Sequence, residues 1–253
     1  MVKRFLKEIL LGLGLYYKVN SFRFRHDQRS ALQQAFYEGL ISKADIVFDV
    51  GANVGQRSEI FSQLASRVVA FEPQAECVRH LKSRFRFKQN VTIEQLALSE
   101  TTGEAVIYES SAHTVSSMSP KYIETVGKQV FRDETWDREV VVQTGTLDQM
   151  IERYGRPRFI KIDVEGFELS VLKGLSQAVP FVSFEFTPMV IDQAKRCVDR
   201  LHEISGDYLF DYCLGEDLNF LLPEHADYET FSRQVVPELE RAGNFGDIYA
   251  IKE

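Results

Sequence analysis

After residue 40, short apolar runs alternate with segments of helical periodicity, and this alternation restricts the possible folds more than any other feature. Such runs are typical of strands buried on both faces of a parallel sheet. With the helices between them, they predict an α/β fold with a mostly parallel, doubly wound sheet and helices on both faces. The expected strands are 46–50, 67–71, 91–96, 105–108, 140–143, 159–164, 179–186, 208–213 and 247–252. The expected helices are 56–65, 74–86, 146–154, a helix ending at 175, and 189–205. Ligands bind such sheets beyond the carboxyl ends of the strands, where the strand order reverses.

The first 40 residues do not follow this pattern. Apolar residues recur there at helical spacing, which predicts a helical cap over residues 1–40 ahead of one domain over residues 41–253. The apolar stretch is interrupted by charges, is shorter than the roughly 20 residues of a membrane span, and lacks a cleavage site. We therefore expect a cytoplasmic protein, in which the cap packs onto the domain or contacts a membrane surface. The periodic positions are Phe5, Ile9, Leu10, Leu13 and Tyr16.

The composition excludes some functions. The 37 acidic and 30 basic residues give a net charge of -7, which argues against nucleic acid as a partner, because phosphate contacts need clustered Lys and Arg. Cys77, Cys197 and Cys213 are far apart, so the spacing indicates neither a disulfide framework nor a zinc site. Residues 109–137 are rich in Ser, Thr and charge and show no clean period, which predicts a functional loop or lid.

A glycine-containing turn follows the first expected strand, in the run Asp49-Val50-Gly51-Ala52-Asn53-Val54-Gly55. Glycine lets the main chain approach a ligand closely and direct N–H groups at it. The dinucleotide-binding pattern needs glycine at positions 53 and 56, which hold Asn and Gln, so a nicotinamide cofactor is disfavoured. Glu72 ends the second strand, where an acidic side chain can accept the hydroxyls of an adenosine ribose. The competing interpretations are a turn without a ligand and a solvated glutamate.

A dense group of charges ends a later strand, in Ile160-Lys161-Ile162-Asp163-Val164-Glu165-Gly166-Phe167-Glu168. Ionised carboxylates are rarely buried without a partner. Alternation along the strand puts Lys161 and Asp163 on one face. The group is either a structural salt-bridge cluster or a site where Asp163 faces a ligand's ammonium or the reacting group, with Glu165 nearby.

Two further residues are candidates for proton removal. Glu185 lies among aromatic residues near the end of a strand, where burial raises the pKa of a carboxyl group toward the range of a general base. An exposed edge position is the alternative. His113 lies in the irregular segment 109–137, and histidine accepts protons near neutral pH. A solvent-exposed loop histidine is the alternative there.

These motifs together resemble the FkbM family of S-adenosylmethionine-dependent methyltransferases. The resemblance covers residues 45–186, and the stretch from Lys161 to Glu168 is its most specific part. It implies a Rossmann-like class I methyltransferase sheet of seven strands in the order 3-2-1-4-5-7-6, with the last strand antiparallel. The other matching motifs are the glycine-containing turn, Phe71-Glu72-Pro73, Ala97-Leu98-Ser99, Thr146-Leu147-Asp148 and Val171-Leu172-Lys173-Gly174.

The resemblance also implies a cofactor and a reaction. S-adenosyl-L-methionine would be the cofactor, with its methionine part at the glycine-containing turn, its ribose at Glu72 and its adenine near Ala97 and Leu98. The reaction would be O-methylation of a sugar, glycan or other small molecule. The candidate cofactor-binding residues are Asp49, Gly51, Asn53, Gly55, Glu72, Ala97, Leu98 and Asp163.

An alcohol is a poor nucleophile, so a base or a metal must help to remove its proton. The candidate bases are Asp163, Glu165, Glu185 and His113. The carboxylates among them can also hold a divalent cation, although no ligand spacing requires one. Two other functions stay open at this point: a non-catalytic adenosine-binding or scaffold protein on the same fold, and a nicotinamide-dependent oxidoreductase. The sequence sets neither the acceptor nor the oligomeric state.

Overall fold

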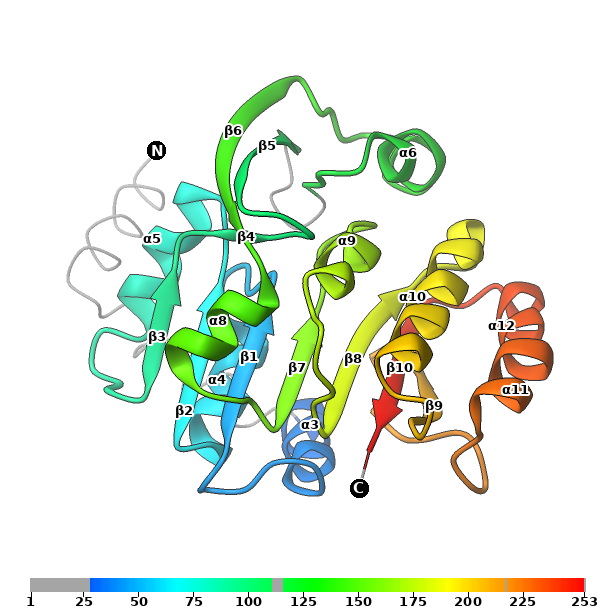
Figure 1. Cartoon of the computed structure of the whole chain (residues 1–253). Coiled ribbons are helices and arrows are strands. Elements are labelled where there is room, and N and C mark those ends of the chain that lie inside the picture. Colours follow the sequence, from blue (N-terminus) through cyan, green and yellow to red (C-terminus); the bar gives the residue numbers. More distant parts are fainter. Residues whose placement is uncertain (1–27, 111–115, 217, 253) are drawn as a thin grey trace.

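The computed structural model describes residues 28–110, 116–216 and 218–252 (Figure 1). Seven strands form one sheet in the order β3-β2-β1-β7-β8-β10-β9. Numbered along this sheet alone, the order reads 3-2-1-4-5-7-6. β10 runs antiparallel to β8 and β9, and the other pairs are parallel. The strands are β1 (Ile46–Val50), β2 (Arg67–Phe71), β3 (Val91–Glu94), β7 (Phe159–Ile162), β8 (Phe181–Phe186), β9 (Leu209–Leu214) and β10 (Gly246–Ile251).

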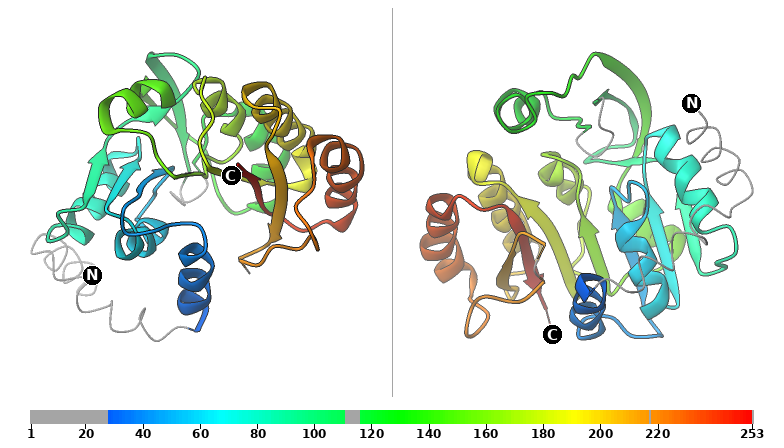
Figure 2. Two further views of the ribbon diagram at one scale, coloured as in Figure 1. Left: turned by 60° about the horizontal axis from the view of Figure 1, so that its bottom comes forward. Right: turned by 180° about the vertical axis from the view of Figure 1, so that it is seen from behind.

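Helices cover both faces of this sheet, as expected (Figure 2). Because side chains alternate along a strand, each face has its own hydrophobic core. On one face, Val47 and Phe159 pack with Tyr37 of α3 and Phe61 of α4. On the other, Phe48 and Ile160 belong to the core that α8, α9 and α10 complete. The helices are α3 (Gln28–Glu38), α4 (Gln56–Leu64), α5 (Ala75–Arg84), α8 (Leu147–Tyr154), α9 (Glu168–Lys173) and α10 (Ile191–Ile204).

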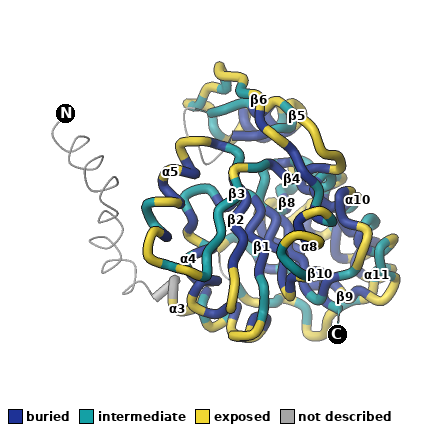
Figure 3. The backbone as a smooth tube through the Cα atoms, turned by 60° about the vertical axis from the view of Figure 1, so that its left-hand side comes forward, coloured by how far each residue is buried: buried dark blue, intermediate teal, exposed yellow. Residues whose placement is uncertain are grey.

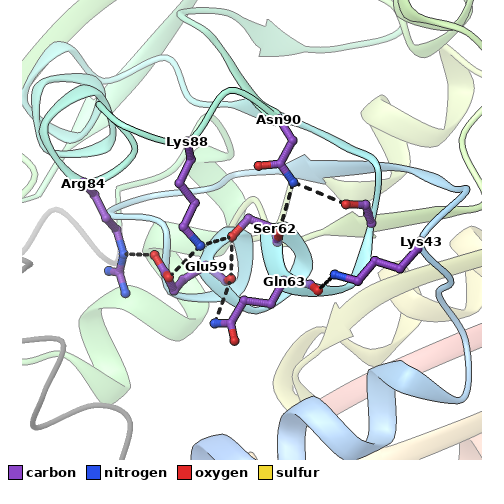
Figure 4. Close-up of polar contacts among 8 residues, drawn as sticks. Lys43, Glu59, Ser62, Gln63, Arg84, Lys88 and Asn90 are labelled. Atoms are coloured by element: carbon purple, nitrogen blue, oxygen red, sulfur yellow. Dashed lines mark hydrogen bonds and ion pairs between the residues drawn. The ribbon is translucent and has the colours of Figure 1, made fainter.

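The central strands are the most thoroughly buried part of the described chain (Figure 3). Polar contacts at the surface hold α4 against the connection between α5 and β3 (Figure 4). Glu59 on α4 pairs with Arg84 at 3.4 Å and with Lys88 at 3.0 Å. Asn90 donates a hydrogen bond of 2.9 Å to the carbonyl of Ser62. These contacts fix the helix that begins at the glycine-containing turn.

The chain differs from the expectation in a second, three-stranded sheet of order β4-β6-β5, inserted between the third and fourth strands of the main sheet. This sheet lies above the carboxyl ends of the parallel strands (Figure 1). A short helical segment follows β5 and lies above β8 and α10. Its first turn begins at Pro120, with Ser119 as the capping residue. The elements are β4 (Ala97–Leu98), β5 (Gly103–Glu109), β6 (Arg138–Gly145), α6 (Pro120–Tyr122), a π-helical turn (Ile123–Gly127) and α7 (Lys128–Val130).

The N-terminal part of the described chain belongs to the domain core. Tyr37 of α3 is completely buried against the sheet, so α3 packs onto the domain, and the division into a cap over residues 1–40 and a domain over 41–253 stays a prediction. The amphipathic stretch predicted between Phe5 and Tyr16 lies outside the described residues. Within the described part of the chain, no helix has the length and apolar character that a membrane span needs.

Helical segments between β9 and β10 were not expected from the sequence. They add Phe231, Val236 and Leu239 to the same core as α10. Each turn is short, so none offers the long apolar period that predicts a helix. The segments are α11 (Tyr228–Thr230), a π-helical turn (Phe231–Val235) and α12 (Val236–Ala242), and a 3-10 turn (Pro188–Val190) precedes α10.

Candidate active site

The glycine-containing turn between β1 and α4 is held tightly against its neighbours. Gly51 and Gly55 have positive φ angles of 81° and 82°, which glycine adopts without strain. A Cβ atom on Gly51 would lie 1.8 Å from the main-chain oxygen of Asp163, so no larger residue fits there. The turn therefore meets the end of β7, and the predicted cofactor loop and the predicted acidic cluster lie side by side.

Glu72 lies beside this turn, as predicted. It is 2% exposed, and its two carboxylate oxygens accept hydrogen bonds from the main-chain N–H groups of Asn53 and Gln74, both at 2.9 Å. Desolvation by burial raises the pKa of Glu72 to about 7, although these hydrogen bonds act in the opposite direction. Asn53 has a left-handed conformation, with φ of 49°. The glycine-containing turn thus fixes the Glu72 carboxylate, and both are expected to contact the same cofactor.

Asp49 lies lower on β1 and is also buried. Its carboxylate accepts a hydrogen bond from the hydroxyl of Ser58, in the first turns of α4. Burial raises the pKa of Asp49 to about 6. In this structure Asp49 joins strand to helix beneath the turn, so any effect on a cofactor would be exerted through the turn above it.

The side chains of Ala97 and Leu98 do not form an open surface. Leu98 packs in the core between the main sheet and α8, and Ala97 packs with Ile107 and Val142 of the second sheet. The apolar pair was expected to face adenine, but the pairing of β4 with β6 turns both side chains into cores. A contact with adenine from these residues would have to come from the main chain.

Three candidate bases lie together at the ends of β7 and β8. Carboxylate oxygens of Asp163, Glu165 and Glu185 all lie within 4.8 Å of one another, and we call these residues the acidic trio. Asp163 donates its main-chain N–H to Val50 at 2.9 Å and keeps 42% of its side chain exposed. The trio is therefore close to the glycine-containing turn and open to solvent on one side.

The electrostatics of the trio favour proton binding. Desolvation, and then the charge of Asp163, raise the pKa of Glu165 to about 8. Desolvation raises the pKa of Glu185 well above its ordinary value, and the nearby charges of Glu165 and Asp163 add to this shift. Like charges this close cannot all ionise easily. Glu165 can therefore hold and release a proton near neutral pH.

Lys161 lies beneath the trio and is 2% exposed. Its ammonium is 3.3 Å from a carboxylate oxygen of Asp163 and 3.0 Å from one of Asp247 on β10. Burial acts to lower the pKa of Lys161, but the two carboxylates outweigh it and raise the pKa above its ordinary value. The predicted common face of Lys161 and Asp163 is confirmed. Asp247 was missed, and an isolated acid in an otherwise apolar C-terminal strand was the signal for it.

The segment 116–122 covers Glu165. The hydroxyl of Tyr122 donates a hydrogen bond to the Glu165 carboxylate, and the hydroxyl of Ser117 donates to the Glu165 carbonyl at 2.5 Å. Tyr122 lies so close to Gly166 that a Cβ atom on Gly166 would be 2.5 Å from the Cβ atom of Tyr122 and 2.6 Å from its ring. Glu165 itself has a positive φ of 52°, a strained conformation for a side chain of its size. Part of the predicted lid therefore touches the site, through a tyrosine that sequence reasoning did not single out.

His113, the remaining candidate base, lies outside the described residues.

A pocket opens next to the trio, between the end of β8, the start of α10 and α6. Glu168 is buried in its wall, where its carboxylate accepts hydrogen bonds from Gly166 N–H at 3.0 Å and from the Gln193 amide at 3.3 Å. Burial raises the pKa of Glu168 to about 7. The lining residues are Tyr122, Gly166, Glu168, Glu185, Phe186, Thr187, Val190, Gln193, Ala194 and Cys197.

The sequence signature of the methyltransferase FkbM domain matches residues 49–207 of this chain. The chain belongs to the FkbM methyltransferase family. The match begins at Asp49 in β1 and includes the glycine-containing turn, Glu72 and all three residues of the trio. The family identity leaves the nicotinamide-dependent oxidoreductase without support.

Two relatives share part of the FkbM region. Hexuronic acid methyltransferase AglP of Haloferax volcanii is 30% identical over 141 residues, which are 55% of this chain and 54% of AglP. AMB antimetabolite synthetase AmbE of Pseudomonas aeruginosa is 29% identical over 172 residues, which cover 56% of this chain and 8% of AmbE. The chain thus spans about half the length of the first relative and a small part of the second.

Among solved structures, precorrin-6y C5,15-methyltransferase from Geobacter metallireducens superposes with a TM-score of 0.46 and 12% identity, covering 89% of this chain and 87% of the other. Fibrillarin of Aeropyrum pernix superposes with a TM-score of 0.45 and 11% identity, over 87% of this chain and 74% of the other. At this level of similarity neither comparison bears on ligand or substrate.

Proposed function

We propose that this FkbM family member transfers the methyl group of S-adenosyl-L-methionine to a hydroxyl oxygen of a sugar, glycan or other small molecule. The acidic trio is the observation on which the proposal rests, because it provides proton acceptors next to the glycine-containing turn. The AglP relative, named as a hexuronic acid methyltransferase, supports a sugar as the acceptor.

The residues at the turn fit the proposed cofactor. Gly51 and Gly55 let the turn pack closely against Asp163 and against α5 with positive φ angles, and this sets the path of the main chain that would meet the methionine part. The carboxylate of Glu72 accepts hydrogen bonds from two main-chain N–H groups and from the Gln74 side chain, which leaves a lone pair for a ribose hydroxyl. In this proposal, Asn53 and Asp49 shape the turn, the main chain at Ala97 and Leu98 meets adenine, and Asp163 faces the cofactor's ammonium or the reacting group.

The bound cofactor would supply a methyl group already activated by its sulfonium. A bond forms between the acceptor oxygen and this carbon, the bond from carbon to sulfur breaks, and its electron pair remains on sulfur. The chain must align the acceptor hydroxyl and accept its proton. Glu185 and Glu165 are the proposed proton acceptors, because their carboxylates lie together at the ends of β8 and β7 and burial raises the pKa of both, that of Glu165 to about 8. His113 remains a candidate for the same role.

A divalent cation at the trio is a second way to activate the hydroxyl. Three carboxylates with oxygens within 4.8 Å of one another are a ligand set that Mg²⁺ or Mn²⁺ accepts. A cation there would lower the pKa of a bound hydroxyl and so replace the base. Activity that survives EDTA treatment would support the carboxylate base. Loss with EDTA and recovery with Mg²⁺ or Mn²⁺ would assign the trio to a cation instead.

Calorimetric titration with S-adenosylhomocysteine, with NAD and NADP as controls, tests the cofactor. Micromolar binding of S-adenosylhomocysteine alone, lost in Glu72→Ala, is the expected result. Glu76→Ala is the matched control, because Glu76 is an exposed residue of α5 close in sequence to Glu72. Binding of a nicotinamide nucleotide instead would overturn the proposal. The absence of binding to all three compounds would favour a non-catalytic scaffold.

Methyl transfer is then tested with labelled S-adenosylmethionine and a panel of sugars and sugar derivatives. Transfer to a hydroxyl group, located by mass spectrometry, is expected. Binding of S-adenosylhomocysteine without transfer to any of these hydroxylated compounds would leave the cofactor assignment intact and overturn the acceptor class.

A further inference from the structure

The pocket beside the acidic trio has the position of an acceptor site. It shares Glu185 with the trio and Tyr122 with the segment that covers Glu165. The free space inside it is about 10 Å³, enough for roughly one water molecule, so the pocket would receive one hydroxyl group of an acceptor rather than enclose the whole molecule. An acceptor held there would present a hydroxyl group to the proposed base.

The polar groups of this pocket are mainly hydrogen-bond acceptors. The Gln193 amide nitrogen donates to the carbonyl of Gly166 and to the carboxylate of Glu168, which uses both of its hydrogens. Its amide oxygen therefore remains available to accept a hydrogen bond. Within the described part of the chain, the carboxylate of Glu185 also has no hydrogen-bond donor. The pocket thus matches a molecule that donates several hydrogen bonds.

The same pocket provides no counter-ion for an anion. None of its lining residues is Lys, Arg or His, within the ranges that the structure describes. Lys161 is the cation beneath the trio, but it is buried and already pairs with Asp163 and Asp247. A carboxylate on the acceptor would therefore find no compensating charge in the pocket, and it would oppose the ionisation of Glu185 that the proposed proton transfer requires.

We propose that this pocket binds an uncharged, polyhydroxylated acceptor, that it discriminates against the corresponding acid, and that Gln193 accepts a hydrogen bond from an acceptor hydroxyl. The inference rests on the proposed function and narrows its substrate class. It also separates this chain from the AglP relative, whose name specifies an acidic sugar.

Matched sugar pairs test the charge preference. Methyl transfer is measured to methyl glucoside and methyl glucuronide, and to the galactose and mannose equivalents, with and without added Mg²⁺. We expect kcat/KM to be at least about tenfold higher for the neutral member of each reactive pair. Equal or better use of the acid, under either condition, would overturn the inference and leave the proposed function standing. If no sugar of either kind reacts while S-adenosylhomocysteine binds, the sugar acceptor and this inference both fail.

A charge introduced at the pocket provides the second test. Gln193→Arg keeps donors for Gly166 and Glu168 and adds a cation, so it should reduce the neutral-over-acid ratio by about tenfold or more. Gln177→Arg makes the same change in an exposed bend before β8, at the opposite end of that strand, and should leave the ratio unchanged. An unchanged ratio in Gln193→Arg, with S-adenosylhomocysteine binding intact, would show that the acceptor binds elsewhere.

Discussion

The two halves of the sheet treat their carboxylates differently. Around β1 and β2, Glu72 accepts two main-chain hydrogen bonds and Asp49 accepts one from Ser58. Around β7 and β8, Glu165 and Glu185 crowd together, and the donor to their carboxylates within the described chain is Tyr122. The first half fixes its acids with donors, while the second half leaves Glu165 and Glu185 under mutual repulsion.

This difference suits the first half of the sheet to binding a ligand and the second half to transferring a proton. A carboxylate held by donors is pre-organised and stays in one position when a ligand arrives. A carboxylate crowded by like charges binds a proton readily, which is the property of a base that works near neutral pH. We therefore expect substitutions in the first half to change cofactor affinity, and substitutions in the second to change the chemical step.

The largest effect is expected from Glu185→Gln, which removes a proposed proton acceptor while keeping the size of the side chain. The turnover number kcat should fall by roughly 10² to 10⁴ fold, while the affinity for S-adenosylhomocysteine changes little. Glu240→Gln, on the exposed side of α12, is the matched control. If Glu185→Gln loses affinity for S-adenosylhomocysteine as well as kcat, the two halves of the sheet do not have the separate roles proposed for them.

Lys161→Met should have the next largest effect, and mainly on stability. Removing one partner of a buried ion pair leaves an uncompensated charge and costs about 3–5 kcal/mol. Asp163 reaches solvent, so most of this cost falls on the less exposed Asp247. Denaturant unfolding of Lys161→Met should show the loss, and adding Asp247→Asn should recover much of it. A loss below about 1 kcal/mol would mean that the network contributes little to stability.

Activity and stability should depend on pH in opposite directions. The base must be ionised, so kcat/KM should rise about tenfold per pH unit and level off no lower than about pH 8, near the pKa of Glu165. Because the pKa of Glu165 is raised on folding, the folded protein holds a proton there that the unfolded chain has released above about pH 4.5. The free energy of unfolding should therefore fall as pH rises through this window.

Urea unfolding between pH 5 and 9 measures this slope, and Glu165→Gln should flatten it. Glu72, Glu168 and Asp49 have raised pKa values too, so their contributions have the same sign. Stability that increases from pH 5 to pH 8 would contradict the electrostatics described for both halves.

Tyr122→Phe should have the smallest effect. Its hydroxyl donates to Glu165 and so lowers the pKa of that carboxyl group. The variant should move the rising limb of the activity profile to higher pH and reduce kcat/KM a few fold at pH 7. Tyr108→Phe, on β5, removes a hydroxyl without a hydrogen bond to the trio and is the control. If the rising part of the plot of kcat/KM against pH does not shift in Tyr122→Phe, Tyr122 only packs against Gly166.

The sequence predicted the main sheet well because buried strands have a strong apolar signal. It also predicted that Glu72 and the trio would lie at the same edge of the sheet, since all of them are at or just beyond the carboxyl ends of strands. Asp247 and Tyr122 were missed because their roles arise from contacts between elements far apart in the chain. The burial of the Leu98 side chain could not be predicted, because the pairing of β4 with β6 leaves no mark in an apolar sequence; the contact of this region with adenine stays a prediction.

The ion pair between Lys161 and Asp247 also affects when the sheet can finish folding during translation. The two residues are 86 positions apart, so at about 5–20 residues per second the lysine is synthesised roughly 4–17 s before its partner. During this interval Lys161 has only the partly exposed Asp163 as a partner, so burial of β7 would lack the second of its two counter-charges. The nascent chain should therefore keep the centre of its sheet unsettled until β10 has left the ribosome, although β10 is the strand farthest in sequence from the glycine-containing turn.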